Sequence, residues 1–133
     1  MPRKIRVLVA KAGCDIHERG ALTMMTAFRD AGMEVLYTGR YQSEAAIART
    51  AVAEDVDVIG VSDLTGSLPI ICRKILEELR RMEADIPVFC GGLLTRADRE
   101  ALLEMGVKAC FGTGSPVGAC VEKVYELVGQ RPS

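Results

Sequence analysis

A single histidine and a nearby carboxylate are the residues of this chain best suited to metal chemistry. His17 is the only histidine in the sequence, and Asp15 stands two positions before it. Neutral imidazole is a good ligand for a transition metal, and a carboxylate on its other ring nitrogen fixes the tautomer and raises the basicity of the metal-binding nitrogen. Lys11 could in turn hold Asp15 ionised, and Gly20 leaves room for a bulky group near the backbone. The alternative is a solvated loop histidine beside a helix-capping aspartate.

Two further segments combine small residues with a hydroxyl or an apolar side chain. Ser62 and Leu64 could line a slot for a flat heterocycle, with the serine hydroxyl satisfying a ring nitrogen. An ordinary polar turn is the alternative there. Gly91 and Gly92 suit either the close approach of a ligand or a sharp turn at the end of a strand.

A glycine-rich run near the C-terminus has two interpretations. Gly112 and Thr113 begin the sequence Gly-Thr-Gly-Ser-Pro, whose backbone amides could cradle a phosphate. The same run could simply open a helix, with Ser115 as N-cap and Pro116 at the first helical position. The sequence leaves both possibilities open.

The elements that must position these residues alternate along the chain. Short β-rich runs are predicted as strands at 5–10, 34–38, 56–61, 87–90 and 109–111. Stretches of helical spacing separate and follow them, the first with an apolar stripe of Leu22, Met25, Phe28 and Ala31. Five successive βα units predict an α/β fold, a doubly wound five-stranded parallel sheet with helices on both faces. The simplest strand order is 2-1-3-4-5, which is flavodoxin-like.

Helix boundary signals agree with this alternation. Ser43 and Ser67 are predicted N-caps, and residues 95–98 read as a capping box. Gly32 and Gly106 stand where helices should end. Ligands of open parallel sheets bind above the carboxyl ends of the strands, near the switch point in strand order. The segments after the first, third, fourth and fifth strands are therefore expected to share one rim.

Length and composition predict a single domain over residues 1–133, with a core at about 4–128 and a loose tail at 129–133. The formal net charge is −1, from 17 basic and 18 acidic residues without a basic block, so neither nucleic acid nor a membrane is an expected partner. The apolar run at 5–10 is too short for a signal-peptide core or a membrane span, which favours the cytoplasm. Five widely spaced cysteines, without a CxxC pair, are expected to be mostly buried and reduced.

Three separated motifs give the chain a resemblance to a known family. DxHxxG at 15–20, SxL at 62–64 and GG at 91–92 together match the signature of cobalamin-binding domains of the base-off/His-on type. Within that family, the first loop resembles the acyl-CoA mutases, with methylmalonyl-CoA mutase and the small subunit of hydroxyisobutyryl-CoA mutase as the nearest types. Lys11 matches a lysine that these mutases place four residues before the aspartate. The chain departs from them at Ile16, Glu18 and Asp63.

The resemblance implies a cofactor and a mode of binding. The cofactor is expected to be adenosylcobalamin, with His17 replacing its dimethylbenzimidazole as the lower axial ligand of cobalt and with Asp15 and Lys11 tuning that imidazole. The displaced nucleotide tail would enter a slot in the sheet's flank. The cofactor-binding residues would be Asp15, His17, Gly20, Ser62, Leu64, Gly91, Gly92, Gly112 and Thr113.

The resemblance also implies an isomerase that works with another chain. Adenosylcobalamin supplies radical chemistry for carbon-skeleton rearrangement. Because 133 residues are too few to include the barrel that binds acyl-CoA in these mutases, a large acyl-CoA-binding subunit is expected as partner in a hetero-oligomer.

Other classes remain as alternatives. A corrinoid methyl carrier of a methyltransferase system shares the three-part signature, although such carriers usually bring an additional helical domain. A receiver domain has the same fold, and Asp63 follows the third strand, where a phosphoacceptor stands. Against that reading, the acidic pair expected after the first strand is reduced to Asp15, and no lysine follows the fifth strand.

Overall fold

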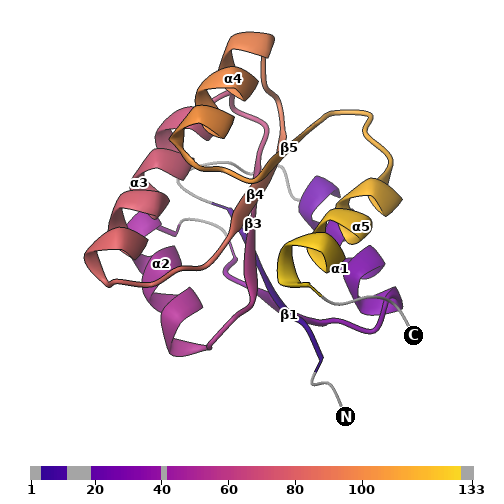
Figure 1. Ribbon diagram of the computed structural model, residues 1–133. Helices are drawn as coiled ribbons and strands as arrows, with labels where there is room; N and C mark the ends of the chain where they lie inside the picture. The colour runs from indigo at the N-terminus through magenta and orange to yellow at the C-terminus, as the bar shows by residue number, and fades with distance from the viewer. Residues whose placement is uncertain (1–3, 12–18, 40–41, 130–133) are drawn as a thin grey trace.

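The computed structural model describes residues 4–11, 19–39 and 42–129, which form one five-stranded sheet flanked by five helices (Figure 1). The strands are β1 (Arg6–Ala10), β2 (Glu34–Tyr37), β3 (Val58–Asp63), β4 (Val88–Gly92) and β5 (Ala109–Gly112). The helices are α1 (Arg19–Asp30), α2 (Glu44–Ala53), α3 (Leu68–Arg81), α4 (Arg96–Met105) and α5 (Val117–Val128). Strands and helices alternate as the sequence predicted.

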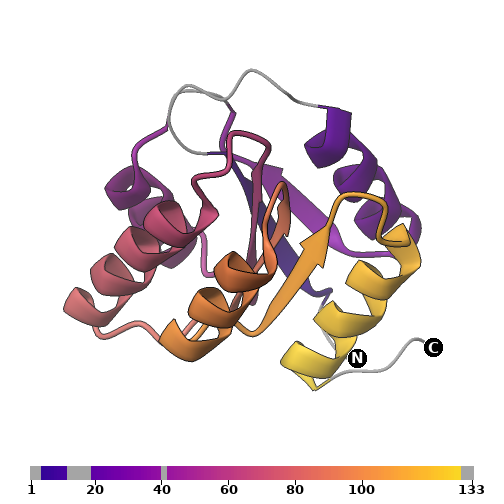
Figure 2. The same cartoon turned by 90° about the horizontal axis from the view of Figure 1, so that it is seen from above.

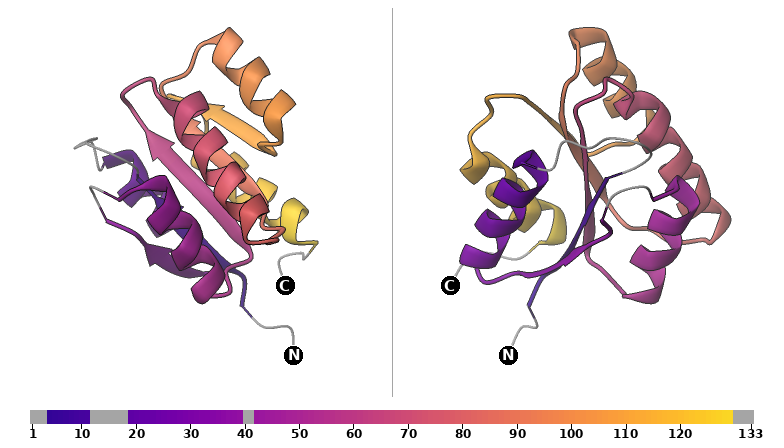
Figure 3. Two further views of the ribbon diagram at one scale, coloured as in Figure 1. Left: turned by 90° about the vertical axis from the view of Figure 1, so that its left-hand side faces the viewer. Right: turned by 180° about the vertical axis from the view of Figure 1, so that it is seen from behind.

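The sheet is parallel throughout and has the order β2-β1-β3-β4-β5, which confirms the predicted flavodoxin-like topology. Helices α2, α3 and α4 cover one face, and α1 and α5 cover the other (Figures 2 and 3). The switch in strand order lies between β1 and β3, so the carboxyl ends of β1, β3, β4 and β5 form one continuous rim.

Alternating side chains of the strands separate the core into two clusters. On β1, Leu8 and Ala10 pack under α2 and α3, whereas Val7 and Val9 pack under α1 and α5. This division follows from the period of two residues along a strand, which sends neighbouring side chains to opposite faces. Because both faces are covered by helices, the strands are apolar at nearly every position, as expected for a parallel sheet.

Two strands run further than the sequence indicated. The strands predicted at 56–61 and 87–90 are observed at Val58–Asp63 and Val88–Gly92. In the register between β3 and β4, Ser62 is opposite Gly91 and Asp63 is opposite Gly92. The polar and glycine residues that were read as loop therefore belong to the paired ends of the strands, where pairing compensates for their weak strand propensity.

Helix starts agree in part with the predicted caps. Ser43 accepts a hydrogen bond from the Ala46 amide at the start of α2 (3.0 Å), which confirms that cap. The capping box of α4 is also confirmed: Thr95 Oγ1 accepts from the Asp98 amide (3.0 Å), and Asp98 Oδ2 accepts from the Thr95 amide (2.9 Å). Ser67 precedes α3 but its side chain makes no capping hydrogen bond.

The start of the last helix differs from the predicted one. One of the two interpretations made Ser115 the N-cap and Pro116 the first helical residue, but Pro116 is the N-cap residue and α5 begins at Val117. The Ser115 amide instead donates to the Gly112 carbonyl (3.1 Å), which closes a tight turn after β5. That turn delays the helix by one residue.

The buried stripe of α1 is also shifted. Leu22, predicted to be in the core, is 51% exposed. The buried side chains of this helix are Ala21, Met24, Met25 and Phe28. Both sets have helical spacing, and the observed one places a full i, i+3, i+4, i+7 pattern against the sheet. This rotation brings Met24 to the rim near the candidate site described below.

None of the helices in the described part of the chain is long and apolar enough to cross a membrane. The longest of them, α3, has 14 residues, whereas a spanning helix needs about 20 predominantly apolar ones.

Candidate functional site

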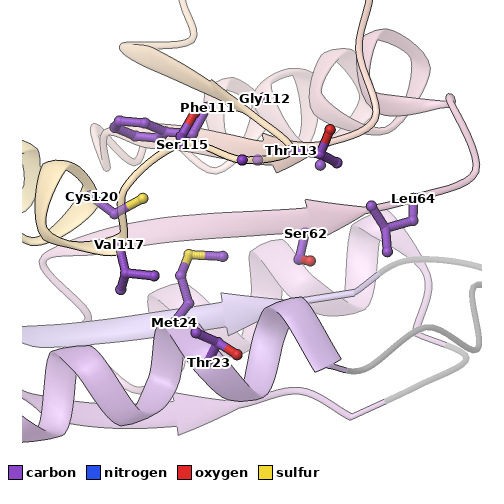
Figure 4. Close-up of a pocket in the computed structure, with 13 residues that line it drawn as sticks. Thr23, Met24, Ser62, Leu64, Phe111, Gly112, Thr113, Ser115, Val117 and Cys120 are labelled. Carbon is purple, nitrogen blue, oxygen red and sulfur yellow. The ribbon is translucent and has the colours of Figure 1, made fainter.

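A pocket of about 330 Å³ opens at the carboxyl ends of β3, β4 and β5, between α1 and α5 (Figure 4). It lies next to the topological switch point, where ligands of such sheets bind. Its lining residues come from five elements and the loops beside them: Thr23, Met24, Ser62, Leu64, Gly91, Gly92, Phe111, Gly112, Thr113, Gly114, Ser115, Val117 and Cys120.

Six residues singled out from the sequence meet in this one pocket: Ser62, Leu64, Gly91, Gly92, Gly112 and Thr113. Gly20 lies in the first turn of α1. Asp15 and His17 lie outside the described residues. The segments that the sequence analysis treated separately therefore form a common wall.

Lys11 follows β1 and is completely buried. Its backbone amide donates to Thr38 Oγ1 (3.3 Å) at the end of the neighbouring strand. Lysine is rarely buried unless its charge is paired, because removing an ammonium from water is costly. The buried Lys11 therefore marks the end of β1 as a polar point in an otherwise apolar strand.

The walls of the pocket are apolar and soft. Figure 4 shows the sulfur atoms of Met24 and Cys120 directed into the space between α1 and α5, with Val117 beside them. Phe111 contributes an aromatic wall, and its ring packs edge-to-face against Phe89 with a centroid distance of 6.2 Å. Among the described lining residues none is charged. Such a surface suits a flat, neutral ring, with sulfur and aromatic groups in favourable contact.

One hydroxyl stands out in these apolar surroundings. Ser62 is only 5% exposed, lines the pocket, and points into it in Figure 4. Its hydroxyl faces the open pocket and is therefore available to bond a polar atom of a ligand.

The two glycines of β4 have different reasons to be glycine. A Cβ on Gly91 would lie 3.3 Å from the Phe111 carbonyl oxygen and would narrow the pocket. Gly92 has φ +137°, and a Cβ there would overlap the carbonyl oxygen of Asp63. The absence of a side chain at Gly91 therefore leaves space in the pocket, while Gly92 permits the ends of β3 and β4 to approach each other closely.

Comparison with known proteins assigns the family. Residues 5–121 match the model of the B12-binding domain, which is most of the chain. The chain belongs to the B12-binding domain family. The predicted resemblance to cobalamin-binding domains is thereby confirmed.

Two relatives match this B12-binding domain along nearly their whole length. It is 38% identical over 128 residues to the 2-hydroxyisobutanoyl-CoA mutase small subunit of Aquincola tertiaricarbonis, covering 96% of this chain and 94% of that one. It is 41% identical over 130 residues to the pivalyl-CoA mutase small subunit of Xanthobacter autotrophicus, covering 97% and 86%. Methylmalonyl-CoA mutase of Cereibacter sphaeroides is 35% identical over 132 residues, but the match spans only 19% of that longer protein.

Solved structures agree on the fold. A cobalamin-binding protein from Desulfitobacterium hafniense superposes with a TM-score of 0.81 at 19% identity, over 96% of this chain and 60% of that one. The receiver domain of the response regulator NarL from Mycobacterium tuberculosis superposes with a TM-score of 0.66 at 20% identity, over 98% and 100%. At these identities the likeness concerns the fold alone.

Asp63 does not resemble a phosphoacceptor. Its side chain is on the α3 side of the sheet and is 1% exposed. Its Oδ1 accepts a hydrogen bond from the Thr65 hydroxyl (2.7 Å), and its Oδ2 accepts one from the Ser67 amide (2.8 Å). With both oxygens engaged, this carboxylate organises the entry to α3 and is not open to attack by a phosphate donor.

Three buried thiols of this B12-binding domain, those of Cys90, Cys110 and Cys120, have raised pKa values. Burial raises the pKa of Cys120, and burial together with Cys90 raises the pKa of Cys110 to about 12. A hydrogen bond with Cys72 and burial raise the pKa of Cys90 still further. All four described cysteines are free and buried, in agreement with the sequence-based expectation, and Cys14 lies outside the described residues. Cys120 therefore lines the pocket as an apolar group.

Four residues that line the pocket were not predicted from the sequence as part of a site. Met24, Phe111, Val117 and Cys120 were assigned to the core or not singled out, yet each lines the site. Helical periodicity shows that a residue faces the sheet but cannot show that it lies opposite an opening. One signal could have found them. Met24 is in the first half of α1, and Val117 and Cys120 are in the first half of α5, which is the end of each helix nearest the ligand-binding rim.

Proposed function

We propose that this chain is the cobalamin-carrying small subunit of an adenosylcobalamin-dependent acyl-CoA mutase. The family match supports cobalamin as the ligand, and the two small subunits of acyl-CoA mutases that it covers at 94% and 86% of their length support the class of enzyme. One observation carries the site: six motif residues from three strand ends converge on one uncharged pocket.

The pocket fits the nucleotide tail of cobalamin. Leu64, Phe111 and Met24 would cover the faces of its benzimidazole ring, and the Ser62 hydroxyl would bond its free ring nitrogen. Burying a ring of roughly 150–250 Å² at about 25 cal/mol per Å² gives on the order of 4–6 kcal/mol before the cost of ordering the tail. Because Gly91 has no side chain, the tail would have room to pass over the end of β4.

The first loop would hold the metal end of the cofactor. We propose that His17 would hold the cobalt of the cofactor through its imidazole, that Asp15 would bond the second ring nitrogen, and that Lys11 would support that carboxylate. Gly20, in the first turn of α1, would let the tail pass beside the backbone. The bound cofactor supplies radical chemistry for rearranging a carbon skeleton. The protein's part is to orient the cofactor and tune its axial imidazole.

The acyl-CoA is proposed to bind to another chain. In methylmalonyl-CoA mutase of Cereibacter sphaeroides the segment matched here is 19% of a longer protein, which supports a large catalytic partner for a separate small subunit. We expect a cytoplasmic hetero-oligomer with that large subunit, with neither nucleic acid nor a membrane as partner. Residues 1–133 would act as a single cobalamin-binding domain.

The axial ligand can be tested by electron paramagnetic resonance. His17 is the only histidine, so ¹⁵N-histidine labelling marks one imidazole and no other. Cob(II)alamin bound to the labelled chain should show nitrogen splitting characteristic of ¹⁵N, and the unlabelled chain should show that of ¹⁴N. His17→Ala should lose the protein-derived splitting. An identical spectrum from labelled and unlabelled protein would refute the assignment of His17.

The enzymatic role needs a reconstitution assay. This chain with adenosylcobalamin should not isomerise acyl-CoA esters alone and should do so after addition of the large mutase subunit from the same genome. Methyl transfer from a methylated corrinoid on this chain, without any acyl-CoA isomerisation in the presence of the large subunit, would favour the methyl-carrier alternative.

A further inference from the structure

Asp63 is a buried carboxylate beside the pocket that does not line it. It is the last residue of β3, and its neighbours on the chain, Ser62 and Leu64, both line the pocket. Because successive side chains of a strand point to opposite faces, the carboxylate of Asp63 lies behind the wall that Ser62 forms. Its hydrogen bonds therefore act on the pocket from the far side of the sheet.

Those hydrogen bonds fix the segment that leaves β3. The Thr65 hydroxyl donates to Oδ1 of Asp63 (2.7 Å), and the Ser67 amide donates to Oδ2 (2.8 Å). Leu64 lies between these anchored points and cannot move independently of them. Hydrogen bonds to a carboxylate are stronger than those between neutral groups, so the two bonds to Asp63 hold the segment from Leu64 to Ser67 in place.

The backbone of Asp63 holds the adjacent strand end in the same way. Its carbonyl oxygen accepts a hydrogen bond from the Leu93 amide (3.0 Å), and Gly92 packs against that carbonyl so closely that a Cβ would overlap it. One residue thus joins the two segments that carry the SxL and GG motifs. Both segments form the wall opposite α1 and α5.

We propose that Asp63 is a positioning residue for the nucleotide tail of cobalamin, holding Ser62, Leu64 and Gly92 at the spacing that the tail requires. This inference rests on the proposed function and assigns a role to a residue that departs from the mutase motif. Asp63 acts on the ligand only through its neighbours and does not touch it. Its loss should therefore affect ligands that carry a tail and leave tail-free corrinoids unaffected.

The test compares cobalamin with cobinamide, a corrinoid that lacks the nucleotide tail. Dissociation constants for both are measured with the wild-type chain and with Asp63→Asn, which keeps the shape but cannot accept both hydrogen bonds. We expect Asp63→Asn to weaken cobalamin binding about tenfold, as for the loss of one hydrogen bond to a charged group, with cobinamide binding changed by less than about twofold.

A matched control comes from the next helix entry. Asp98 accepts a hydrogen bond from the Thr95 amide (2.9 Å) in the capping box of α4 and does not line the pocket. Asp98→Asn should lower the melting temperature and leave the ratio of cobalamin to cobinamide affinity unchanged. If Asp98→Asn alters that ratio as much as Asp63→Asn does, the effect reflects general loosening and the proposal is overturned.

Thr65→Val keeps the test decisive if Asp63→Asn does not fold. Thr65 is exposed, and the substitution removes its hydroxyl, which bonds Asp63 (2.7 Å) and the Ser67 hydroxyl (3.1 Å). It should weaken cobalamin about threefold and spare cobinamide. An unchanged ratio in the folded variant overturns the positioning role. A wild-type chain that binds neither corrinoid would instead refute the proposed function, so the two failures are distinguishable.

Discussion

Substitution of Gly92 by alanine should destabilise the fold far more than an ordinary glycine substitution. Gly92 combines a φ of +137° with close contact to Asp63: an added Cβ would overlap the Asp63 carbonyl oxygen and lie 2.8 Å from its carbonyl carbon. The atoms in its way belong to the backbone of β3, which is hydrogen-bonded in the middle of the sheet and has little freedom to retreat.

The magnitude follows from these two contributions. A non-glycine residue held at such a φ costs about 1–3 kcal/mol, and overpacking typically costs a further 1–3 kcal/mol. Their sum is about 4 kcal/mol of the free energy of unfolding. For a domain of this size, about 4 °C is lost per kcal/mol, so the melting temperature should fall by about 15 °C.

Gly114→Ala is the matched control for this measurement. Gly114 also lines the pocket and also has a positive φ, +90°, but nothing lies within 4 Å of the Cβ that it would gain. It should cost only about 1 kcal/mol, for the backbone conformation alone. Both variants are compared with wild type by thermal and urea denaturation followed by circular dichroism. Equal melting temperatures for Gly92→Ala and Gly114→Ala would refute the reasoning, because the contact with Asp63 would then carry no cost.

Two further predictions concern the cysteines. Cys120→Phe should fill the pocket and weaken cobalamin binding about 100-fold, which is a part of the 4–6 kcal/mol that tail burial contributes, whereas Cys120→Ala should leave the pocket open. Calorimetric titration of both variants measures these affinities. Wild-type affinity in Cys120→Phe would exclude the pocket as the tail site. The raised pKa of Cys110, about 12 against 9.0 unfolded, means that the native state keeps a proton that the unfolded state releases. That contribution to stability is complete below pH 9 and is lost as the pH rises towards 12, by at most about 1.4 kcal/mol per pH unit. Urea unfolding across this range should show a shallower loss for Cys110→Ser than for wild type, and parallel curves would contradict the prediction.

The sequence was sufficient to predict the order of the elements, and that order was enough to locate the rim. Alternation of β-rich runs with helical stripes leaves few topologies once right-handed crossovers are required. The C-terminal ends of β3 and β4 were not predictable from propensity, since Ser62, Asp63, Gly91 and Gly92 are all weak strand formers. Their pairing depends on each other across the two strands, which local sequence does not reveal.

The residues of α1 that line the pocket were not predicted for a related reason. Leu22 and Met24 both fit an apolar stripe on α1, and only the packing of the helix on the sheet decides that Met24 turns inward and Leu22 outward. Hydrophobic periodicity determines a face to within about one residue, and the pocket is sensitive to that one residue.

The two faces of the sheet have different roles at the site: one bears the pocket and the other supports its wall. On the side of α1 and α5, the described residues that line the pocket are uncharged, and they leave it open. On the side of α3, the charged Asp63 is buried, bonded through both carboxylate oxygens, and tied through its carbonyl to the end of β4. A pocket wall made of glycine and serine has few contacts of its own to keep it in place. Such a wall can leave space for a ligand and still be rigid only if other contacts hold the strand ends together. In this chain the Asp63 carboxylate, inside the SxL motif, provides those contacts on the opposite face of the sheet.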